Sequence, residues 1–310
     1  LWFWLVAVMI AIYAVMDGFD FGAGILHLFV AKTDGERRAV LGAIGPLWDG
    51  NEVWLLAGGG AMFLAFPGVL AAGFSGFYLA MFMVVWTLIL RGISIEFRSH
   101  VHDELWRAFW DRTFAFASFL MPILLGAALG NVIRGVPLDG SRYFNLPLFT
   151  DFGTGNPAGI LDWFTVLVGV FALVTVAAHG SLFLAWKTQG AVHERSRALA
   201  RPLWLVVVGL WLAATLATGA VSPEIFARFP RSFLAWLFFL VHLAGLAAVF
   251  YGLAKGRDLL AFLGSGAFIL GLLATTAACV WPVMLKSTLD PALSLTALNA
   301  GAGAHGLRAG

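Results

Sequence analysis

The chain has 310 residues, of which 61% are hydrophobic and only 12% are charged, and its mean hydropathy is +0.90. A water-soluble domain carries about 25% charged residues, so this composition excludes a soluble globular protein and indicates that the bilayer solvates most of the surface. The net charge of +2 lies in short loops, which excludes a nucleic-acid-binding face, and the single cysteine, Cys279, excludes an internal disulfide and a multi-cysteine metal or iron–sulfur site.

Eight segments contain enough apolar residues to cross a hydrocarbon core, which requires about 20 residues in a helix. They are residues 1–30, 52–67, 68–96, 112–134, 160–186, 202–221, 233–254 and 259–285. We expect a tight turn at Pro67-Gly68 to separate the second segment from the third. The sequence therefore predicts an all-α polytopic membrane protein with eight transmembrane helices.

Lysine and arginine are unevenly distributed between the two ends of these helices. Twelve of the 19 lie in the loops that follow the first, third, fifth and seventh helices, and six lie on the opposite side. Cytoplasmic loops carry the excess of Lys and Arg. We therefore expect these loops to be cytoplasmic and the N-terminus to face outward.

A weak internal repeat predicts two four-helix units. Asp17-Gly18 aligns with His179-Gly180, Lys32-Thr33 with Lys187-Thr188, and Glu36-Arg37 with Glu194-Arg195, although gaps are required. Chance similarity of loop chemistry is the alternative. The units would comprise residues 1–136 and 159–286, joined by an extracytoplasmic loop at 137–158 and followed by a polar tail at 287–310.

Two aspartates lie inside the first predicted helix. Asp17 and Asp20 are three residues apart and so share a helical face. Ionisable residues within a membrane span are costly and by default mark a functional site. The alternative is that both lie at the cytoplasmic end of the helix, in contact with headgroup water.

The stretch "GPLWDGNEVW", residues 45–54, places two carboxylates just before an apolar run. Asp49 and Glu52 have the spacing of a helix cap with a reciprocal glutamate. A carboxylate at the cytoplasmic rim can also collect protons and pass them to further carboxylates. Trp48 and Trp54 fit interfacial anchors. Capping and proton uptake are compatible functions of the same residues.

The third predicted helix ends with "LILRGISIEFRSH", residues 88–100. Arg91 follows more than twenty mostly apolar residues, and Glu96 and Arg98 come shortly after it. Arg91 can extend to the interface along its aliphatic stem, or it can pair with a carboxylate of the first or second helix. We expect a buried charge pair here, with a partner that the sequence does not identify.

Three histidines, His27, His179 and His242, lie within predicted spans. Two on facing helices would suffice to bind a haem iron, but a lone histidine in a helix is more often a packed, hydrogen-bonded residue. The chain has no CxxCH, no HExxH and no glycine-rich phosphate loop, and the three glycines at 58–60 indicate helix packing. No metal site is expected in this chain.

Several motifs together resemble subunit II of the cytochrome bd-type quinol oxidases, including the cyanide-insensitive branch. The resemblance is dense over residues 1–100 and looser from 110 to 286. Its motifs are "DGFDFGAGIL", "TDGERR", "GPLWDGNEVWL", "FPGVLAAGFSGFY" and "LRGISIEFRSH". The resemblance implies a haem-free subunit of two four-helix units in the bacterial cytoplasmic membrane. Its homologous partner, subunit I, would carry haem b and haem d, or only b-type haem, and would bind quinol. The complex would reduce dioxygen to water with protons taken from the cytoplasm.

The resemblance also implies roles for individual residues. Asp49 matches a carboxylate at the cytoplasmic entrance of a proton path, and Trp54 matches a tryptophan near a hydrophobic dioxygen route. Asp17 and Asp20 match a pair in the first helix, and Arg91 matches a buried arginine. Glu52 stands where some members have glutamine, which favours Asp49 over Glu52 as the proton carrier. The ninth helix of the family is absent after the "SLT" at 294–296, so we expect either an open tail or a truncated C-terminus.

The sequence favours an accessory oxidase subunit that supplies a scaffold and admits protons. Its partners would be subunit I in a heterodimer and membrane lipid, and a small accessory subunit could join them. Two alternatives belong to other classes. One is a self-contained b-type membrane cytochrome that uses His179 and His242. The other is a secondary transporter with Asp17, Asp20, Asp49 and Arg91 along a substrate path.

Overall fold

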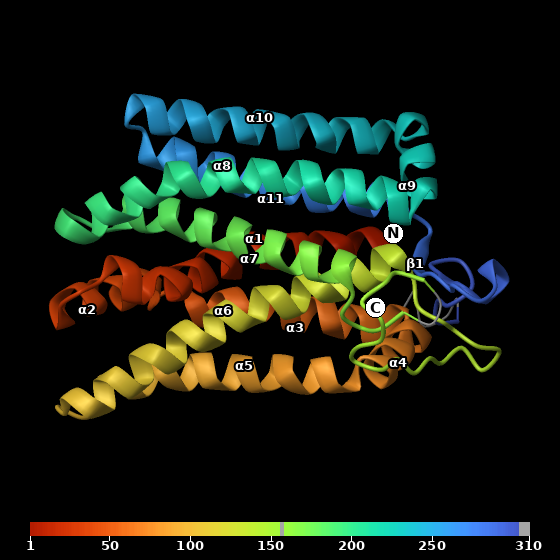
Figure 1. The fold of residues 1–310 in the computed structure, drawn as a ribbon, viewed down its shortest axis with the longest axis horizontal. Helices are drawn as coiled ribbons and strands as arrows, with labels where there is room; N and C mark the ends of the chain where they lie inside the picture. The colour runs from red at the N-terminus through yellow and green to blue at the C-terminus, as the bar shows by residue number, and fades with distance from the viewer. Residues whose placement is uncertain (156–157, 304–310) are drawn as a thin grey trace.

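The computed structural model describes residues 1–155 and 158–303, most of which are helical. Within those residues, eleven α-helices are followed by a small two-stranded sheet (Figure 1). The elements are α1 (Trp2–Val30), α2 (Asp34–Ile44), α3 (Trp48–Ala65), α4 (Pro67–Gly76), α5 (Tyr78–Phe97), α6 (Glu104–Arg134), α7 (Trp163–Lys187), α8 (Gly190–Val221), α9 (Pro223–Arg228), η1 (Phe229–Arg231), α10 (Phe233–Lys255), α11 (Asp258–Val280), β1 (Val283–Leu285), η2 (Pro291–Leu293) and β2 (Leu295–Thr296).

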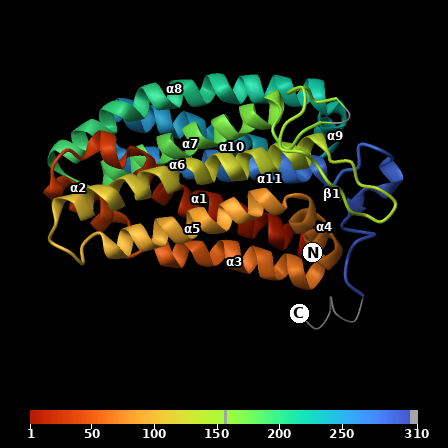
Figure 2. The same ribbon diagram turned by 60° about the horizontal axis from the view of Figure 1, so that its bottom comes forward.

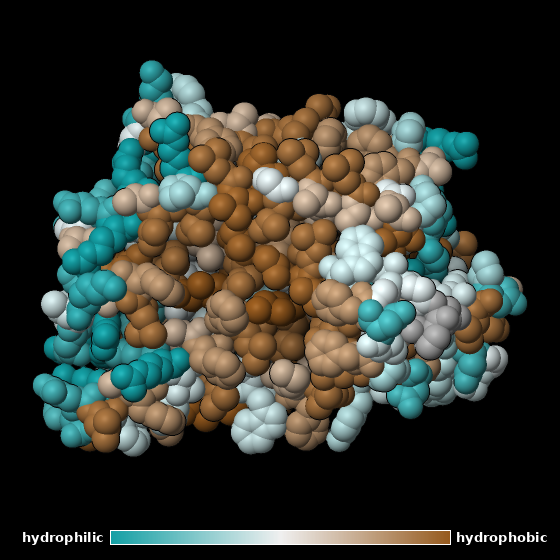
Figure 3. All heavy atoms as spheres, viewed as in Figure 1, coloured by the Kyte–Doolittle hydropathy of each residue, from teal (hydrophilic) through white to brown (hydrophobic). Residues whose placement is uncertain are grey.

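The long helices run side by side with their polar residues at the two ends of the bundle. Figure 3 shows a broad apolar belt between two hydrophilic ends. Among the described residues, seven helices are long and apolar enough to cross a membrane, or up to eight if α3 and α4 form one bent span. The predicted all-α polytopic membrane fold is confirmed.

The arrangement places α1 and α7 in the middle of the bundle. Helices α3, α5 and α6 lie on one side of them and α8, α10 and α11 on the other (Figure 1). The turned view separates the two ends of the molecule: α2 lies at one end, and α4, α9 and β1 lie at the other (Figure 2). The prediction of two repeated four-helix units remains a prediction.

The central pair, α1 and α7, is in backbone contact at two glycines. A Cβ atom at Gly22 would lie 2.2 Å from the Val176 carbonyl oxygen and 2.6 Å from the Gly180 Cα, and a Cβ at Gly180 would lie 2.3 Å from the Gly22 carbonyl carbon. Small residues allow such close approach between membrane helices. Gly22, the second glycine of the "MDGFDFG" motif, therefore allows α1 and α7 to pack in close contact.

The chain changes direction sharply next to the predicted turn, but the bend lies at Phe66, and Pro67 and Gly68 are helical. The chain bends by 117° between α3 and α4, and Pro67 is the first residue of α4. Proline is favoured at the first helical position because it has no N–H to leave unpaired, and it disfavours helical geometry in the residue before it, here Phe66. The predicted span 68–96 is itself broken at Phe77, and the helix long enough to cross a membrane is α5, which begins at Tyr78.

Helices extend beyond the apolar segments that predicted them. Helix α6 begins at Glu104, eight residues before the predicted position, and α8 begins at Gly190, twelve residues before its predicted position. Hydropathy detects only the lipid-facing part of a helix, whereas the backbone hydrogen bonds continue into the polar ends. Helix α2, absent from the predicted elements, is a further example, with a capping box between Thr33 and Glu36.

The segment predicted as an open tail is ordered as far as it is described. Strand β1 pairs with β2, and Val136 donates its N–H to the Lys286 carbonyl while Thr288 donates to the Val136 carbonyl. Ala302 donates to the carbonyl of Ala65 at the end of α3. Residues 287–303 are thus attached to the 136–138 loop and to α3; the remainder of the predicted tail, 304–310, lies outside the described residues.

Candidate functional site

A buried polar cluster joins α1, α3 and α5; we call it the carboxylate cluster. Its members are Asp17, Asp20, Asn51, Glu52 and Arg91. The Arg91 guanidinium lies 2.6 Å from an Asp17 oxygen and, through its other terminal nitrogen, 2.6 Å from an oxygen of Glu52. Arg91 and Asp17 are fully buried, whereas the Glu52 side chain remains 24% exposed. Arg91 therefore pairs with one carboxylate in the interior and one at its edge.

Asp20, the second aspartate of α1, lies beside this ion pair. Asn51 donates its side-chain amide to Asp20 at 2.8 Å and to the Met16 carbonyl at 3.2 Å. Asp20 is fully buried, and its other oxygen has no hydrogen-bond partner among the described residues. The Phe21 ring lies under the Arg91 guanidinium, 4.1 Å from the ring centroid. The Asn51 amide thus contacts Asp20, and the Phe21 ring contacts Arg91, in places that water would occupy around an exposed charge.

Asp49 does not cap α3. The helix begins with Trp48, its N-cap residue is Leu47, and no side chain caps it. Asp49 is exposed in the first turn, and Glu52 lies one turn further along the same helix. The predicted reciprocal cap is therefore wrong, because Glu52 extends to Arg91 on α5 instead of back to the helix terminus. The carboxylates of α3 and α1 form a series of decreasing exposure from Asp49 through Glu52 to Asp17 and Asp20.

Glu96 and Arg98, expected in a buried charge pair, have different environments. Glu96 is exposed, so its predicted place in a buried pair is wrong. Arg98 is only 2% exposed and holds the buried Asp111 of α6, with its Nε 2.6 Å from one Asp111 oxygen and a terminal nitrogen 3.2 Å from the other. The same guanidinium also bonds Asp34 of α2 at 2.9 Å.

Asp111 is the centre of a second polar network, which the sequence reasoning missed. Its oxygens also accept from His27 of α1 at 2.7 Å and from Arg37 of α2 at 2.9 Å. This Asp111 network, made of His27, Asp34, Arg37, Arg98 and Asp111, ties together α1, α2, α5 and α6. The predicted span began at residue 112, which assigned Asp111 to a loop; its position one residue before an apolar run was the available signal.

Carboxylates of α2 are held in the charged form by their surroundings. Burial is the largest single influence and raises the pKa of Asp34, but a hydrogen bond from Arg98 and the charges of Arg98, Arg107 and Arg38 together lower it below its ordinary value. The backbone N–H groups of Lys32 and Thr33, followed by Arg195, lower the pKa of Glu36. The Glu36–Arg195 pair, at 2.9 Å, connects α2 to α8. Helix α2 is therefore attached electrostatically to both halves of the bundle.

The two tryptophans of the α3 motif lie at its edges. Trp48 is partly buried, and its ring lies near Gly92 of α5, where a Cβ atom would be 3.4 Å from it. Trp54 is partly buried against an apolar cluster that includes Tyr13 and Phe21. Both rings therefore pack beside the carboxylate cluster, on the α3 side of it.

The histidines are engaged by neighbouring helices. His179 uses both ring nitrogens, one 2.6 Å from the Ser265 hydroxyl and one 3.0 Å from the Val15 carbonyl. His242 Nδ1 lies 2.9 Å from the Phe268 carbonyl, and His27 bonds Asp111. A bis-histidine haem site requires a free nitrogen on each residue, which His179 lacks. Within residues 1–155 and 158–303, no group of three or more His, Cys, Asp or Glu is placed to hold a metal ion.

Comparisons with known proteins assign this architecture to a family. The profile described as cytochrome bd terminal oxidase subunit II matches residues 1–309. Cytochrome bd ubiquinol oxidase subunit 2 of Bacillus subtilis (strain 168) is 32% identical over 309 residues, 99% of this chain and 88% of that protein. Cytochrome bd-I ubiquinol oxidase subunit 2 of Escherichia coli (strain K12) is 39% identical over 218 residues, 68% of this chain. The chain spans only 56% of the length of the E. coli relative.

The fold resembles that of a solved structure. A chain of the bd oxidase from Geobacillus thermodenitrificans superposes with a TM-score of 0.74, covering 98% of this chain and 89% of that one, at 16% sequence identity. At this identity the likeness supports the fold alone.

Proposed function

The chain belongs to the cytochrome bd terminal oxidase subunit II family, and on this premise we propose that it is the haem-free second subunit of a membrane quinol:dioxygen oxidoreductase. The complex would oxidise quinol and reduce dioxygen to water, in a bacterial cytoplasmic membrane. Haem b and haem d, or b-type haem alone, would reside in a homologous subunit I that forms a heterodimer with this chain. A small accessory subunit would be compatible with the same assembly.

We infer that this chain contributes a scaffold and a proton entrance. The observation that carries the second part is the series of carboxylates from Asp49 to Asp20. Asp49 is exposed at the start of α3, Glu52 is 24% exposed one turn deeper, and Asp17 and Asp20 are fully buried. A proton path needs acidic groups that lead from water into the apolar interior.

The charge balance of the carboxylate cluster supports proton uptake. Asp17 and Glu52 pair with one guanidinium, that of Arg91, and Asp20 lies beside them on Asn51, so the cluster holds three carboxylates and one cation. Full ionisation would leave a charge of −2 in surroundings where each uncompensated ion costs several kcal/mol. A proton bound by one carboxylate reduces that cost. Such a cluster can accept a proton from Asp49 and release it toward a partner subunit.

The orientation follows from the same proposal. The end of the bundle with α2 and the Asp111 network would face the cytoplasm, because it carries the excess of Lys and Arg. The N-terminus, at the other end (Figure 1), would face outward. Trp54 and Trp48 would border a dioxygen route or the interface with subunit I, since both are only partly buried in the isolated chain.

The other two candidate functions have less support. The hydrogen bonds of His179 disfavour a self-contained cytochrome. The pairing of Arg91 with two carboxylates fills the interior that a transported solute would need. Family membership supports neither alternative.

Optical spectroscopy with the chain alone and with its partner tests the proposal. We expect no haem band in the reduced-minus-oxidised spectrum of the purified chain. Haem bands and quinol-dependent oxygen uptake should appear only after co-expression with subunit I. A haem band from this chain alone that is lost in a His179→Ala/His242→Ala variant would establish the cytochrome instead.

A further inference from the structure

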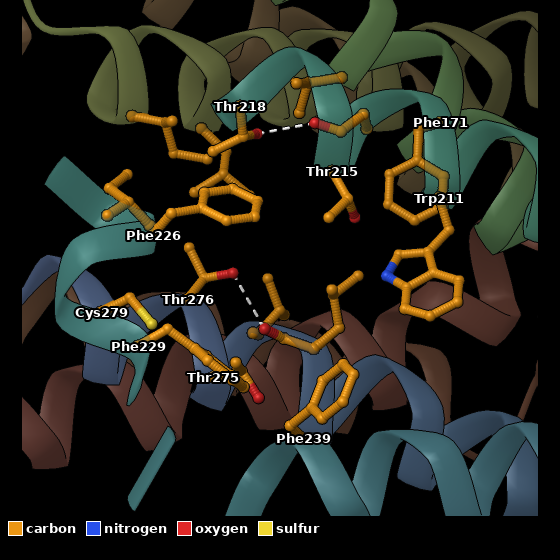
Figure 4. A pocket seen from close by; sticks show the side chains of 17 residues that line it. Phe171, Trp211, Thr215, Thr218, Phe226, Phe229, Phe239, Thr275, Thr276 and Cys279 are labelled. Carbon is orange, nitrogen blue, oxygen red and sulfur yellow. Dashed lines mark hydrogen bonds between the residues drawn. The ribbon is translucent and has the colours of Figure 1, made fainter. Parts of the chain in front are cut away.

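A cavity of about 280 Å³ lies among the helices, and none of its lining residues belongs to the carboxylate cluster. Its walls come from α6, α7, α8, α9, α10 and α11 (Figure 4). Trp211 and Thr218 on α8 mark its extent along one wall, and Leu272 and Cys279 on α11 mark it along another. Each of these stretches is about 10 Å long at 1.5 Å per residue. The cavity is therefore elongated along the helix axes, in the direction of a lipid chain.

The lining is almost entirely apolar in its accessible chemistry. Thr218, Thr275 and Thr276 donate their hydroxyls to carbonyl oxygens of their own helices, one turn earlier. Among the described residues, only the Thr215 hydroxyl and the Trp211 indole N–H on this wall make no hydrogen bond to another residue, and both lie beside the open centre (Figure 4). A buried water needs two to four polar partners. These two groups can hold at most a single water molecule, so an aliphatic chain suits the rest of this lining better than water does.

Two arginines lie next to the residues that line the α9 end of the cavity. Phe226 and Phe229 line the cavity, and Arg228 and Arg231 belong to the same short segment. Arg228 donates to the carbonyl oxygens that end α11, at 3.0 Å from Val280 and 3.3 Å from Trp281, and Arg231 is exposed. Within the described part of the chain, neither has a carboxylate within 4.0 Å. No carboxylate of the described residues therefore neutralises either guanidinium, although Arg228 already donates one terminal nitrogen to the carbonyl oxygens that end α11.

An apolar slot with uncompensated arginines at its rim fits one kind of molecule from the bilayer. We propose that the cavity holds an acyl chain of an anionic phospholipid whose phosphate contacts Arg228 and Arg231. Basic residues beside membrane helices bind anionic headgroups. The acyl chain of the same lipid would occupy the apolar space between the surrounding helices. The site involves none of the residues of the carboxylate cluster, so it is independent of the proposed oxidase role.

Lipid retention by the purified oxidase complex tests the site. The complex is washed in detergent and supplied with phosphatidylglycerol or phosphatidylcholine, and mass spectrometry measures the lipid that it retains. Thr215→Trp should fill the cavity and reduce retained phosphatidylglycerol at least fivefold. Leu216→Trp, on the neighbouring residue that is 75% exposed, is the matched control and should retain the wild-type amount. Arg231→Gln, at an exposed position, should reduce the preference for phosphatidylglycerol about threefold.

Three results would overturn the proposal. The first is that Thr215→Trp and Arg231→Gln both retain as much phosphatidylglycerol as the wild-type complex. The second is that the wild-type complex retains the two phospholipids equally. The third is that an isoprenoid quinone is recovered in place of phospholipid. If Thr215→Trp prevents assembly, the lipid preference of Arg231→Gln decides the question, because this surface change does not alter the packing.

Discussion

Arg91 of α5 and Asp17 of α1, 74 residues apart in the sequence, form an ion pair at 2.6 Å in which both side chains are fully buried. The guanidinium also holds Glu52 of α3. One side chain therefore fixes the relative positions of three helices. Removing one partner of a buried pair leaves an uncompensated charge, at a cost of about 3–5 kcal/mol.

Loss of the Arg91 charge should impair assembly more than turnover. We expect Arg91→Gln to reduce the amount of assembled complex strongly, because Asp17 and Glu52 would then repel each other inside the bundle. Arg91→Gln combined with Asp17→Asn should recover part of the loss, since it removes one unpaired carboxylate. Size-exclusion chromatography of the solubilised complex measures both. A fully assembled Arg91→Gln complex would contradict a structural role for this pair.

Neutralising Asp49 should slow quinol oxidation without loss of haem. The effect of Asp49→Asn should be several-fold, smaller than the about 10²–10⁴-fold of a positioned acid–base group, because bulk water also reaches this exposed residue. Oxygen uptake and the haem spectrum are measured on the same sample. Glu96 is an exposed carboxylate at the end of α5, so Glu96→Gln is the control and should retain full turnover. Loss of haem in Asp49→Asn would remove the argument for proton uptake.

Asp111→Asn should destabilise the protein by about 3–5 kcal/mol. The carboxylate accepts from His27, Arg37 and Arg98, and the amide would leave Arg37 without its counter-charge and Arg98 with that of Asp34 alone. Glu104→Gln, in the exposed first turn of the same helix, should cost less than about 1 kcal/mol. Thermal unfolding in detergent compares the two variants. Equal stability would show that Asp34 alone neutralises the arginines.

The contact between α1 and α7 should not tolerate a methyl group. In Gly22→Ala the new Cβ would lie 2.2 Å from the Val176 carbonyl oxygen, so the helices must separate, and we expect a lower yield of folded protein. Gly209→Ala on α8 is the matched control, because nothing lies within 4 Å of its Cβ. It should be neutral or stabilising by up to about 1 kcal/mol. Similar behaviour of the two variants would contradict the close contact.

The attachment of α2 to α8 should weaken in acid. The pKa of Glu36 is lowered in the folded protein by backbone N–H groups of Lys32 and Thr33 and by Arg195. A lowered folded-state pKa contributes stability above the ordinary glutamate value, about 4.3, and this contribution disappears as pH falls below it. The protection of α2 amides against hydrogen exchange, taken relative to the intrinsic exchange rate at each pH, should therefore decrease below that pH. Glu36→Gln should exchange rapidly at neutral pH too and lose this part of the pH dependence.

Some features of the candidate site could be predicted because they depend on single residues in an apolar context. Asp17, Asp20 and Arg91 stand out against their neighbours, since burying a charge without a partner is costly. Asp111 escaped detection because it adjoins the end of an apolar run, and only the contact with Arg98 shows that it is buried. Whether Glu52 caps α3 or reaches α5 depends on how the two helices are rotated, which spacing along one helix does not reveal.

The sequence by itself determined that the chain is a helical membrane protein and indicated its family, because hydropathy and local motifs are properties of consecutive residues. Only the tertiary structure decided which carboxylates Arg91 and Arg98 bind, where the chain bends at Phe66, and that residues 287–303 pack against the 136–138 loop. These features arise between segments far apart in the chain. Their free energy depends on distance, burial and orientation in space, and none of these quantities is encoded in the periodicity of a single helix.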